Sequence, residues 1–396
     1  MLNPKFLILI PDGMSDLPIK ELGNKTPLEV AKTPTMDSWA SKAEVGMAIN
    51  VPEGMPPGSD VANLSIFGFY PRDFYTGRAP LEAANQGIEL GDRIAYRCNM
   101  VTLQDGIMKD FTAGHIKTEE TDKFLNVLKE AWKDEPVEIY TGKSYRNLLI
   151  APHDWAEAKC TPPHDITDQA YEPHLPRGGC SDKLIDLMVR SQDIFKDHPL
   201  NRERSVPVSS IWLWGQGGKP QLPVYKDKFG VTGVVISAVD LLKGIARLTG
   251  LEVIDVPGAT GFIDTNYEGK AHAALEALKT HDMVLIHLES TDETGHMGDT
   301  KLKIQSIEDC DKRVFSILKS ELEKSETPYH ILLMPDHPTP ISLKTHTSDP
   351  VPYLLYRSDD EKNSGLEKFS ESSVGKVTEN NPIPGHELTN KLLKIL

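Results

Sequence analysis

Short apolar runs alternate with amphipathic helical segments along most of this 396-residue chain, and few folds accommodate such a pattern. The runs typical of buried strands are Phe6–Ile10, Val234–Ser237, Leu251–Val256, Met283–Leu288, His330–Met334 and Val351–Tyr356. Helical patterns lie between them at Ala238–Thr249, Tyr267–Thr280 and Lys301–Ser320. Strands that alternate with helices predict an α/β fold with a doubly wound, mostly parallel sheet and helices on both faces.

Further elements are expected toward the two ends of the chain. Leu28 to Trp39 contains helix formers, but Pro34 should break or restart the helix. Glu361 to Asn381 is polar and is expected to be irregular. Gly385 to Leu396 is expected to close the chain as a short helix. Met1 to Ile10 has no small-residue cleavage site, so we expect a first strand there and not a signal peptide.

The pattern of predicted strands and helices changes near Gly91. Ile94–Leu103 is typical of a long strand with a hairpin turn after it, and Tyr145–Ile150 of a second strand. Helical patterns follow at Thr118–Asp134 and Ser181–Lys196. We therefore expect a smaller α+β domain at residues 92–205, inserted into a core domain made of residues 1–91 and 206–396. The Pro- and His-rich stretch from Cys160 to Gly179 should be a long loop of the kind that often carries function.

Composition excludes several classes of protein. The formal net charge of −15 argues against a general nucleic-acid binder, although a small anionic substrate needs only a local basic cluster. No run approaches the roughly 18–20 apolar residues of a membrane span. The four cysteines show no CxxC spacing, so free thiols in a reducing cytoplasm are expected.

Acidic residues and histidines follow three of the apolar strands. Asp12 comes after the strand that ends at Ile10, and Asp292 lies four residues past Leu288. Asp336 and His337 follow the strand that ends at Met334. In open α/β sheets, ligands bind beyond the carboxyl ends of the strands. These side chains should therefore meet at one edge of the sheet.

The residue types at that edge are ligands for divalent cations. Asp292 and His296 are four apart, so on a helix they would share a face and could hold one cation together. Asp336 and His337 are adjacent and cannot face the same way, so they would serve two cations or a bridge. Each motif alone could equally be a solvated loop, as could His346. Their recurrence at strand ends favours a real site.

Ser59 is the one hydroxyl inside these motifs that is placed like a nucleophile. The segment from Val51 to Asp60 holds three prolines and two glycines, so Ser59 should sit on a turn. A helix from Val61 to Phe67 could follow and direct backbone N–H groups at an anion. Two nearby cations can deprotonate a hydroxyl and hold a phosphoryl group. The pattern predicts phosphoryl transfer through a metal-activated serine.

The chain resembles a cofactor-independent (2,3-bisphosphoglycerate-independent) phosphoglycerate mutase of the archaeal type, in the alkaline phosphatase superfamily. The resemblance covers nearly the whole chain, in order. The motifs that carry it are Ile10–Gly13, Pro57–Asn63, Ile211–Gly217, Ile236–Gly244, Val256–Gly261, Asp264–Tyr267, Asp292–His296, Asp336–Pro340 and His346–Pro352.

This resemblance implies roles for individual residues. Ser59 would be the nucleophile that becomes phosphoserine. One cation would be held by Asp12, Ser59, Asp336 and His337, and the other by Asp292, His296 and His346. The cations would be manganese or magnesium, with zinc or cobalt as further options. Manganese is favoured because magnesium prefers oxygen ligands alone. No 2,3-bisphosphoglycerate would be needed.

The insertion would resemble the family's transferase domain, which grips the glycerate portion of the substrate. Its candidate substrate-binding residues are His115, Arg146, Arg177, Arg202 and Arg204, with Lys270 added from the core domain. Arginine forks suit carboxylate and phosphate oxygens. The expected reaction interconverts 3-phosphoglycerate and 2-phosphoglycerate, and the expected partner is this small molecule alone.

Three alternatives remain open at this stage. A phosphatase, phosphonate hydrolase or nucleotide phosphodiesterase could share the metal core and would release its product to water. A phosphopentomutase could share the serine and the cations but act on ribose phosphates. A non-catalytic metal-binding scaffold would bind cations without turnover. The sequence sets neither the metal nor the oligomeric state.

Overall fold

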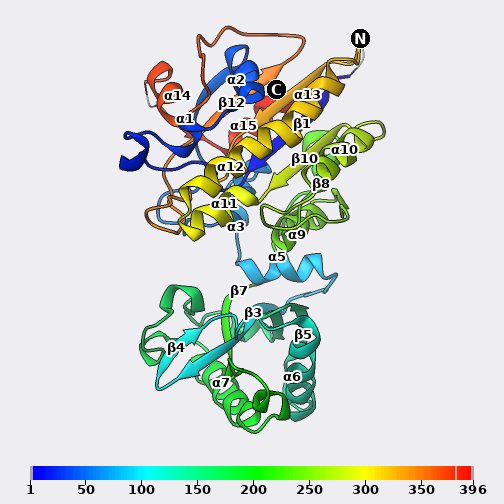
Figure 1. The fold of residues 1–396 in the computed structure, drawn as a ribbon. Coiled ribbons are helices and arrows are strands. Elements are labelled where there is room, and N and C mark those ends of the chain that lie inside the picture. Colours follow the sequence, from blue (N-terminus) through cyan, green and yellow to red (C-terminus); the bar gives the residue numbers. More distant parts are fainter. Residues whose placement is uncertain (1–2, 380, 394–396) are drawn as a thin grey trace. The chain divides into compact units, whose positions relative to one another are not determined.

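The computed structural model describes residues 3–379 and 381–393. The chain forms two compact units, one made of Met1–Tyr75 and Leu222–Leu396 and the other of Thr76–Gln221 (Figure 1). None of the described helices combines the length and the apolar character that a membrane crossing requires.

The first unit is built on an eight-stranded sheet in the described part of the chain, in the order β13-β2-β12-β11-β1-β10-β8-β9. Its strands are β1 (Lys5–Pro11), β2 (Glu44–Ile49), β8 (Gly233–Ile236), β9 (Glu252–Ile254), β10 (Met283–Leu288), β11 (Tyr329–Leu333), β12 (Val351–Arg357) and β13 (Ile383–Pro384). β1 lies between β10 and β11 and is parallel to both. The expected doubly wound α/β class is confirmed.

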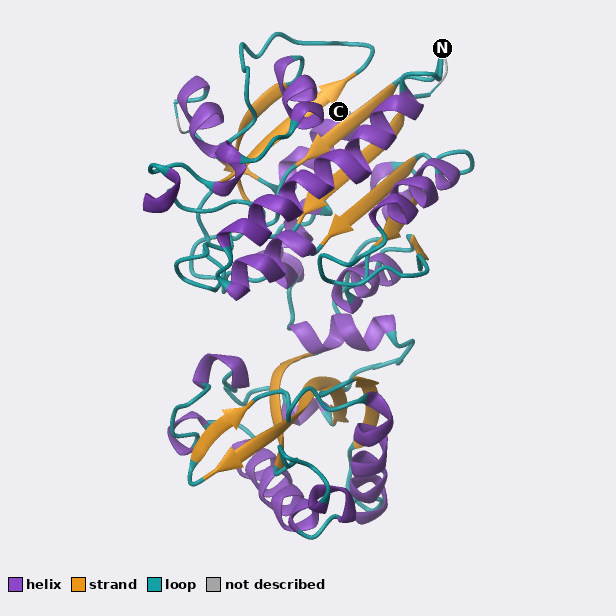
Figure 2. Ribbon diagram, in the orientation of Figure 1, coloured by secondary structure: helices purple, strands orange, loops and turns teal. Residues whose placement is uncertain are grey.

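Helices cover both faces of this sheet (Figure 2). The longer ones are α2 (Pro34–Ser41), α3 (Ser59–Ile66), α9 (Asp240–Leu248), α10 (Tyr267–Ala277), α11 (Ser290–Met297), α12 (Thr300–Cys310), α13 (Ser316–Leu322) and α15 (His386–Leu393). Leu7 and Leu9 of β1 pack in one apolar cluster with side chains of α2, α10, α12 and α13. α15 contacts β11 and α3. Alternate residues of β1 point to opposite faces, so both faces bury apolar surface.

Several local expectations need correction. β12 is antiparallel to β11 and to β2, and β2 itself was not predicted. The expected helix Lys301–Ser320 is divided into α12 and α13 by a π-helical segment at Asp311–Phe315. The Asp311 carboxylate there accepts hydrogen bonds from the N–H groups of Thr35 and Met36, at the first turn of α2.

The segment expected to be irregular contains a helix, α14 (Glu371–Val377), which buries Val374. Pro34 begins α2 after the short α1 (Pro27–Val30), as its position predicted. The last three residues of the helix expected at the end of the chain lie outside the described residues.

The second unit is an α+β unit with a sheet in the order β4-β3-β6-β5, to which β7 adds by pairing with β3. Its strands are β3 (Ile94–Gln104), β4 (Ile107–Asp110), β5 (Glu138–Lys143), β6 (Arg146–Ala151) and β7 (Ser210–Gly217), and its longer helices are α5 (Arg78–Asn85), α6 (Thr118–Ala131) and α7 (Ser181–Lys196). Asp105 and Gly106, both at positive φ, turn β3 into β4.

This unit extends beyond the expected insertion of 92–205 on both sides. β7 pairs with β3 in antiparallel register, with Leu213 opposite Cys98. α5 contacts both β3 and β7. Side chains of α6 and α7 share an apolar cluster with Trp212 and Leu213 of β7, so β7 belongs to the core of this unit.

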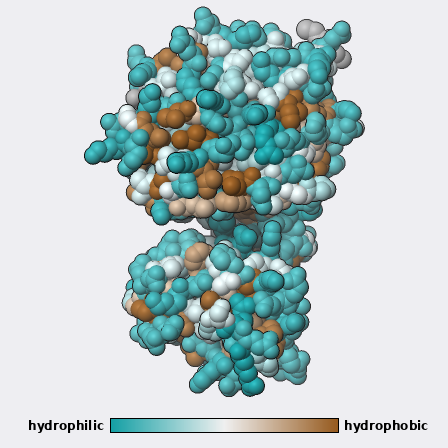
Figure 3. Space-filling model, in the orientation of Figure 1, coloured by the Kyte–Doolittle hydropathy of each residue, from teal (hydrophilic) through white to brown (hydrophobic). Residues whose placement is uncertain are grey.

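Hydrophilic residues cover most of the face of the molecule seen in Figure 3, and apolar residues form small groups among them. The larger exposed apolar side chains among the described residues are Leu17, Val30, Val127, Val189, Val224, Met297, Leu343 and Val377. Scattered apolar side chains of this kind are normal for a globular protein surface.

The partly buried carboxyl of Glu371 gives a prediction for stability against pH. Burial raises its pKa to about 7, because the ionised form is poorly solvated. Below pH 4.5 both folded and unfolded chains hold this proton. Between pH 4.5 and 7 only the folded chain keeps it, so the free energy of unfolding falls as the pH rises, by up to about 3 kcal/mol before solvent screening.

The substitution Glu371→Gln removes this titration. Urea unfolding should therefore show the variant gaining stability relative to the original protein as the pH rises from 5 to 7.5. Glu367→Gln, at an exposed neighbouring carboxyl, is the matched control and should show no such trend. Parallel pH curves for Glu371→Gln and the unsubstituted protein would contradict the interpretation.

Candidate active site

Strand pairing brings the predicted acidic residues together at the carboxyl edge of the first unit's sheet. Pro11 of β1 lies opposite Leu288 of β10, and the N–H of Asp12 donates to the Leu288 carbonyl at 2.9 Å. Leu9 lies opposite Leu333 of β11. β1, β10 and β11 are parallel neighbours, so the segments after their last residues emerge side by side. Asp12, α11 and the Asp336–His337 segment leave the sheet at this edge.

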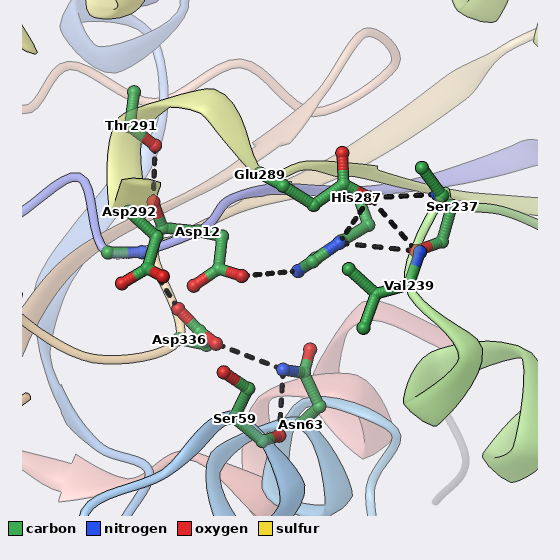
Figure 4. Close-up of polar contacts among 12 residues, drawn as sticks. Asp12, Ser59, Asn63, Ser237, Val239, His287, Glu289, Thr291, Asp292 and Asp336 are labelled. Atoms are coloured by element: carbon green, nitrogen blue, oxygen red, sulfur yellow. Dashed lines mark hydrogen bonds and ion pairs between the residues drawn. The ribbon is translucent and has the colours of Figure 1, made fainter. Parts of the chain in front are cut away.

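One group of side chains gathers around Asp336. Single ligand atoms of Asp12, Asp336 and His337, all buried, lie within 4.8 Å of one another. Ser59, the first residue of α3, places its Oγ 3.1 Å from His337 Nε2. Asn63, one turn further on, donates from Nδ2 to the Ser59 carbonyl at 2.9 Å and to Asp336 Oδ2 at 3.0 Å (Figure 4). Asn63 thus ties the serine to the carboxylate.

A second group gathers around Asp292. Ligand atoms of Asp292, His337 and His346 also lie within 4.8 Å of one another, so His337 is shared by the two groups. On α11, Asp292 and His296 face the same way, with Oδ2 and Nε2 3.3 Å apart. His346 Nε2 lies 3.3 Å from the other oxygen of Asp292.

The tautomers of two histidines point to a cation between them. His296 Nδ1 lies 2.9 Å from the Lys344 carbonyl and His346 Nδ1 lies 3.1 Å from the Pro57 carbonyl. A carbonyl can only accept, so each Nδ1 carries a proton, and a ring that is neutral has its lone pair at Nε2. Burial acts to lower the pKa of His296, but the Asp292 carboxylate raises it to about 9, so without metal a proton can occupy the space between the two rings. The two Nε2 atoms are 2.9 Å apart. Two facing lone pairs repel unless a proton or a metal ion lies between them.

The carboxylates show the same need for positive charge. Burial raises the pKa of Asp12 well above its ordinary value, and the negative charges of Asp336 and Asp292 raise it further. Burial also acts to raise the pKa of Asp292, but its contacts with His296 and His346 lower it well below the ordinary value. Asp12 Oδ1 is buried without a hydrogen-bond partner among the described residues. The donor set therefore fits divalent cations, which carboxylates and imidazoles hold together.

Space at this edge depends on Gly13. Its backbone has a φ of +60°, and a Cβ added there would lie 2.6 Å from Asp292 Oδ1 and 2.8 Å from Asp292 Cα. The Gly13 N–H also donates to Asp336 Oδ1 at 3.0 Å. A glycine is required because the backbone passes between the two groups in a left-handed conformation.

Sequence reasoning missed a set of polar residues behind Asp12. His287, inside β10, places Nε2 3.0 Å from Asp12 Oδ2 and Nδ1 2.9 Å from Glu289 Oε1 (Figure 4). Burial acts to lower the pKa of His287, but Glu289 and Asp12 raise it to about 10. The available signal was a histidine near the end of an apolar strand, with a glutamate two residues after it.

The predicted substrate-binding residues fall in different surroundings. Lys270 on α10 is fully buried, and its Nζ bonds Glu289 Oε2 at 2.7 Å, so it has no exposed surface. Arg204 is held by Glu120 at 2.8 Å. His115, Arg146, Arg177 and Arg202 are exposed, and of these Arg146 stacks over the Tyr145 ring at 5.4 Å.

A cluster of arginines in the second unit was not predicted in full. The buried Arg97 of β3 places Nε 3.0 Å from Glu82 Oε2, and Arg78 places Nε 3.3 Å from the other oxygen of that carboxylate. Burial acts to raise the pKa of Glu82, but Arg97, Arg78 and Arg146 together lower it. The Arg97 guanidinium also lies 4.5 Å from the centre of the Trp214 ring. One carboxylate faces three guanidinium groups, which leaves an excess of positive charge.

The different surroundings of Asp12 and Asp292 predict different effects on stability in metal-free protein. Asp12→Asn removes repulsion from two carboxylates as well as the 3.0 Å contact with His287, so thermal and urea unfolding should show a smaller loss of stability than in Asp292→Asn. Asp292→Asn removes contacts with two histidines and should cost about 1–3 kcal/mol. Addition of Mn²⁺ should stabilise all three proteins, but it should stabilise the two variants less than the unsubstituted protein. Equal losses in the two metal-free variants would contradict this account of the charges.

Comparisons with known proteins agree on one family. A family model described as 2,3-bisphosphoglycerate-independent phosphoglycerate mutase matches residues 40–201. A protein of that name from Methanosarcina acetivorans is 50% identical, covering 93% of this chain and 95% of its own length. Another from Methanothrix thermoacetophila is 51% identical, covering 89% of this chain and 90% of its own length.

Solved structures show the same fold. A protein from Pyrococcus horikoshii aligns with a TM-score of 0.79 and 29% identity, covering 100% of this chain and 98% of that one. A cofactor-independent phosphoglycerate mutase from Thermoplasma acidophilum aligns with a TM-score of 0.64 and 23% identity, covering 99% of each chain. With relatives that are half identical over nearly its whole length, the chain belongs to the family of 2,3-bisphosphoglycerate-independent phosphoglycerate mutases.

Proposed function

We propose that this enzyme interconverts 3-phosphoglycerate and 2-phosphoglycerate by passing the phosphoryl group through Ser59, at a site that holds two divalent cations. The observation that carries the proposal is the position of the Ser59 hydroxyl, 3.1 Å from Nε2 of the histidine that both ligand groups share. A hydroxyl at this junction lies beside both candidate cation positions.

The residues suited to each cation follow from the two groups. Asp12, Asp336, His337 and Ser59 would hold one, and Asp292, His296 and His346 the other. Manganese suits this mixture of imidazole nitrogens and carboxylates better than magnesium, which prefers oxygen ligands. Such a pair of cations would supply a lowered pKa at the serine hydroxyl and neutralise charge on the phosphoryl group.

The chain's own residues fix the nucleophile. Asn63 holds the Ser59 carbonyl and Asp336 at once, so it fixes the backbone of the serine relative to this carboxylate. The expected use of the α3 N-terminus for the phosphate finds less support, because the Val61 N–H already donates to Asp60 Oδ1 at 3.1 Å. Asp60 is itself held by the Tyr75 hydroxyl at 2.5 Å. Positive charge for the phosphoryl group would thus come from the cations.

In the proposed reaction, Ser59 Oγ attacks phosphorus in line with the glycerate oxygen, the P–O bond to glycerate breaks, and phosphoserine forms. The free glycerate reorients, and its other hydroxyl takes the phosphoryl group back from Ser59. Glycerate must stay bound between the two steps, because water would otherwise hydrolyse the phosphoserine.

The arginine cluster of the second unit supports a role in holding glycerate. Arg78, Arg97 and Arg146 surround the single carboxylate of Glu82. Their remaining positive charge would balance one more carboxylate. Arg97 and Arg78 are already engaged with Glu82, whereas Arg146 is exposed. Arg146 is therefore the member best placed to contact the substrate. Arg177 and Arg202 stay weaker candidates, since neither takes part in this cluster.

The serine gives the first test of the function. With 3-phosphoglycerate, Mn²⁺ and no 2,3-bisphosphoglycerate, an enolase-coupled assay should detect 2-phosphoglycerate, and a parallel assay should detect no free phosphate. Ser59→Ala should lose at least about 10³-fold in turnover, because it removes the hydroxyl proposed to accept the phosphoryl group. Its Mn²⁺ content should remain measurable.

A matched control lies on the same helix. Ser65 of α3 is buried, donates to the Asn50 carbonyl at 2.5 Å and belongs to neither ligand group, so Ser65→Ala should keep most of its turnover. Release of phosphate without isomerisation would replace the mutase with a phosphatase. Faster turnover of ribose phosphates would indicate a phosphopentomutase. Bound Mn²⁺ without any turnover would leave a metal-binding scaffold.

Arg146 gives a separate test of substrate binding. Arg146→Gln should raise the KM for 3-phosphoglycerate roughly 10-fold or more, since a charged hydrogen bond contributes about 1.5–3 kcal/mol. Arg93→Gln is the control, because Arg93 is also an arginine of this unit but pairs with Glu138 at 2.5 Å. An equal rise in KM for both variants would point to general electrostatic attraction and against a specific contact.

A further inference from the structure

We propose that Lys270, Glu289 and His287 form a buried positioning chain that fixes the Asp12 carboxylate, so that Lys270 acts on the active site through this chain and not by contact with substrate. The inference rests on the proposed metal site, since Asp12 is one of its suggested ligands. Three observations support it: the contacts of His287, the complete occupation of Glu289, and the single unpartnered oxygen of Asp12.

The His287 ring bridges two carboxylates. It is fully buried in β10, with Nε2 3.0 Å from Asp12 Oδ2 and Nδ1 2.9 Å from Glu289 Oε1. A rotation of the ring would break both contacts together. The orientation of the Asp12 carboxylate is therefore coupled to the position of Glu289, although Glu289 belongs to neither ligand group.

Glu289 is held by donors from two segments in addition to its contact with His287. Its Oε1 accepts from the Ser237 hydroxyl at 3.0 Å and from the Ala238 N–H at 2.9 Å, both just after β8. Its Oε2 accepts from Lys270 Nζ at 2.7 Å. Lys270 is fixed in turn by the His287 carbonyl, at 2.9 Å. Figure 4 shows Ser237, Glu289, His287 and Asp12 in this succession.

The positioning chain engages one carboxylate oxygen of Asp12 and leaves the other available. Oδ2 faces His287, while Oδ1 is buried without a hydrogen-bond partner among the described residues and lies 3.7 Å from His337 Nε2. The backbone of Asp12 is fixed as well, because the Thr291 hydroxyl donates to its carbonyl. A ligand held in this way needs no reorganisation when a cation binds.

A purely structural role for the same residues makes a different prediction. Buried ion pairs contribute little to stability compared with apolar residues of the same size. His330 provides the comparison: it is buried in β11 of the same sheet, and its Nε2 pairs with Asp359 Oδ1 at 2.7 Å, but it contacts neither ligand group. Loss of either histidine should cost stability, whereas only His287 should affect the cation.

The test measures Mn²⁺ binding by electron paramagnetic resonance in full-length protein, together with thermal unfolding of the metal-free form and steady-state kinetics. His287→Asn and Lys270→Met should weaken Mn²⁺ binding about 10- to 100-fold at one of two sites. Their kcat should fall at limiting Mn²⁺ and recover at high Mn²⁺, with KM for 3-phosphoglycerate changed less than about twofold. His330→Asn should lose comparable thermal stability with unchanged Mn²⁺ affinity.

Other outcomes would overturn the inference. A higher KM in Lys270→Met with unchanged Mn²⁺ affinity would make Lys270 a substrate ligand. Unchanged Mn²⁺ binding in His287→Asn would make the chain structural. If unsubstituted protein bound no Mn²⁺, the metal assignment of the proposed function would fail first. Should the buried substitutions prevent folding, Ser237→Ala provides a milder variant, because it removes one bond to Glu289, a 3.3 Å contact with His287 Nδ1 and the acceptor of the Val239 N–H. It should still weaken Mn²⁺ binding severalfold, and a null effect there would also count against the chain.

Discussion

The placement of β1 between two parallel neighbours is the constraint on which the active site depends. β10 and β11 hydrogen-bond to opposite edges of β1 along its length, so the three strands end together. Asp12, the helix bearing Asp292, and the Asp336–His337 segment then begin within a few ångströms of one another. A slip of β1 against either neighbour would separate the ligand groups, because successive residues of a strand point to opposite faces.

This convergence has an electrostatic cost. Burial and the neighbouring carboxylates raise the pKa of Asp12, which means that the metal-free fold resists its full ionisation. The chain offsets part of this cost with His287, which Lys270 and Glu289 hold in place. Such sites exchange stability for function, and the cation that restores the balance of charge would also perform the chemistry.

The sequence alone was sufficient for features set by local pattern. The strands that end at Ile10, Leu288 and Met334 were predicted because buried strands are apolar throughout, and the acidic residues stand directly after them. The face shared by Asp292 and His296 followed from helical spacing. The family itself was recognisable from motifs that extend over nearly the whole chain, and the comparisons confirm it.

Features set by distant pairings could not be predicted in the same way. β7 joins β3 although more than a hundred residues separate Cys98 from Leu213, and nothing local distinguishes β7 from a core strand. Lys270 was expected to bind substrate, yet it is buried and pairs with a glutamate that follows β10. Arg97 is hidden in an apolar strand, and its importance depends on Glu82 from α5. Each case needs a partner that only the fold supplies.

The two units carry local charges of opposite sign. Asp12, Asp292 and Asp336 make the first unit's site strongly negative, so without cations it would repel a phosphorylated substrate. The arginines around Glu82 give the second unit an excess of positive charge that suits a carboxylate. Removal of metal should therefore weaken the binding of a phosphorylated substrate at the first unit's site as well as the chemistry proposed there.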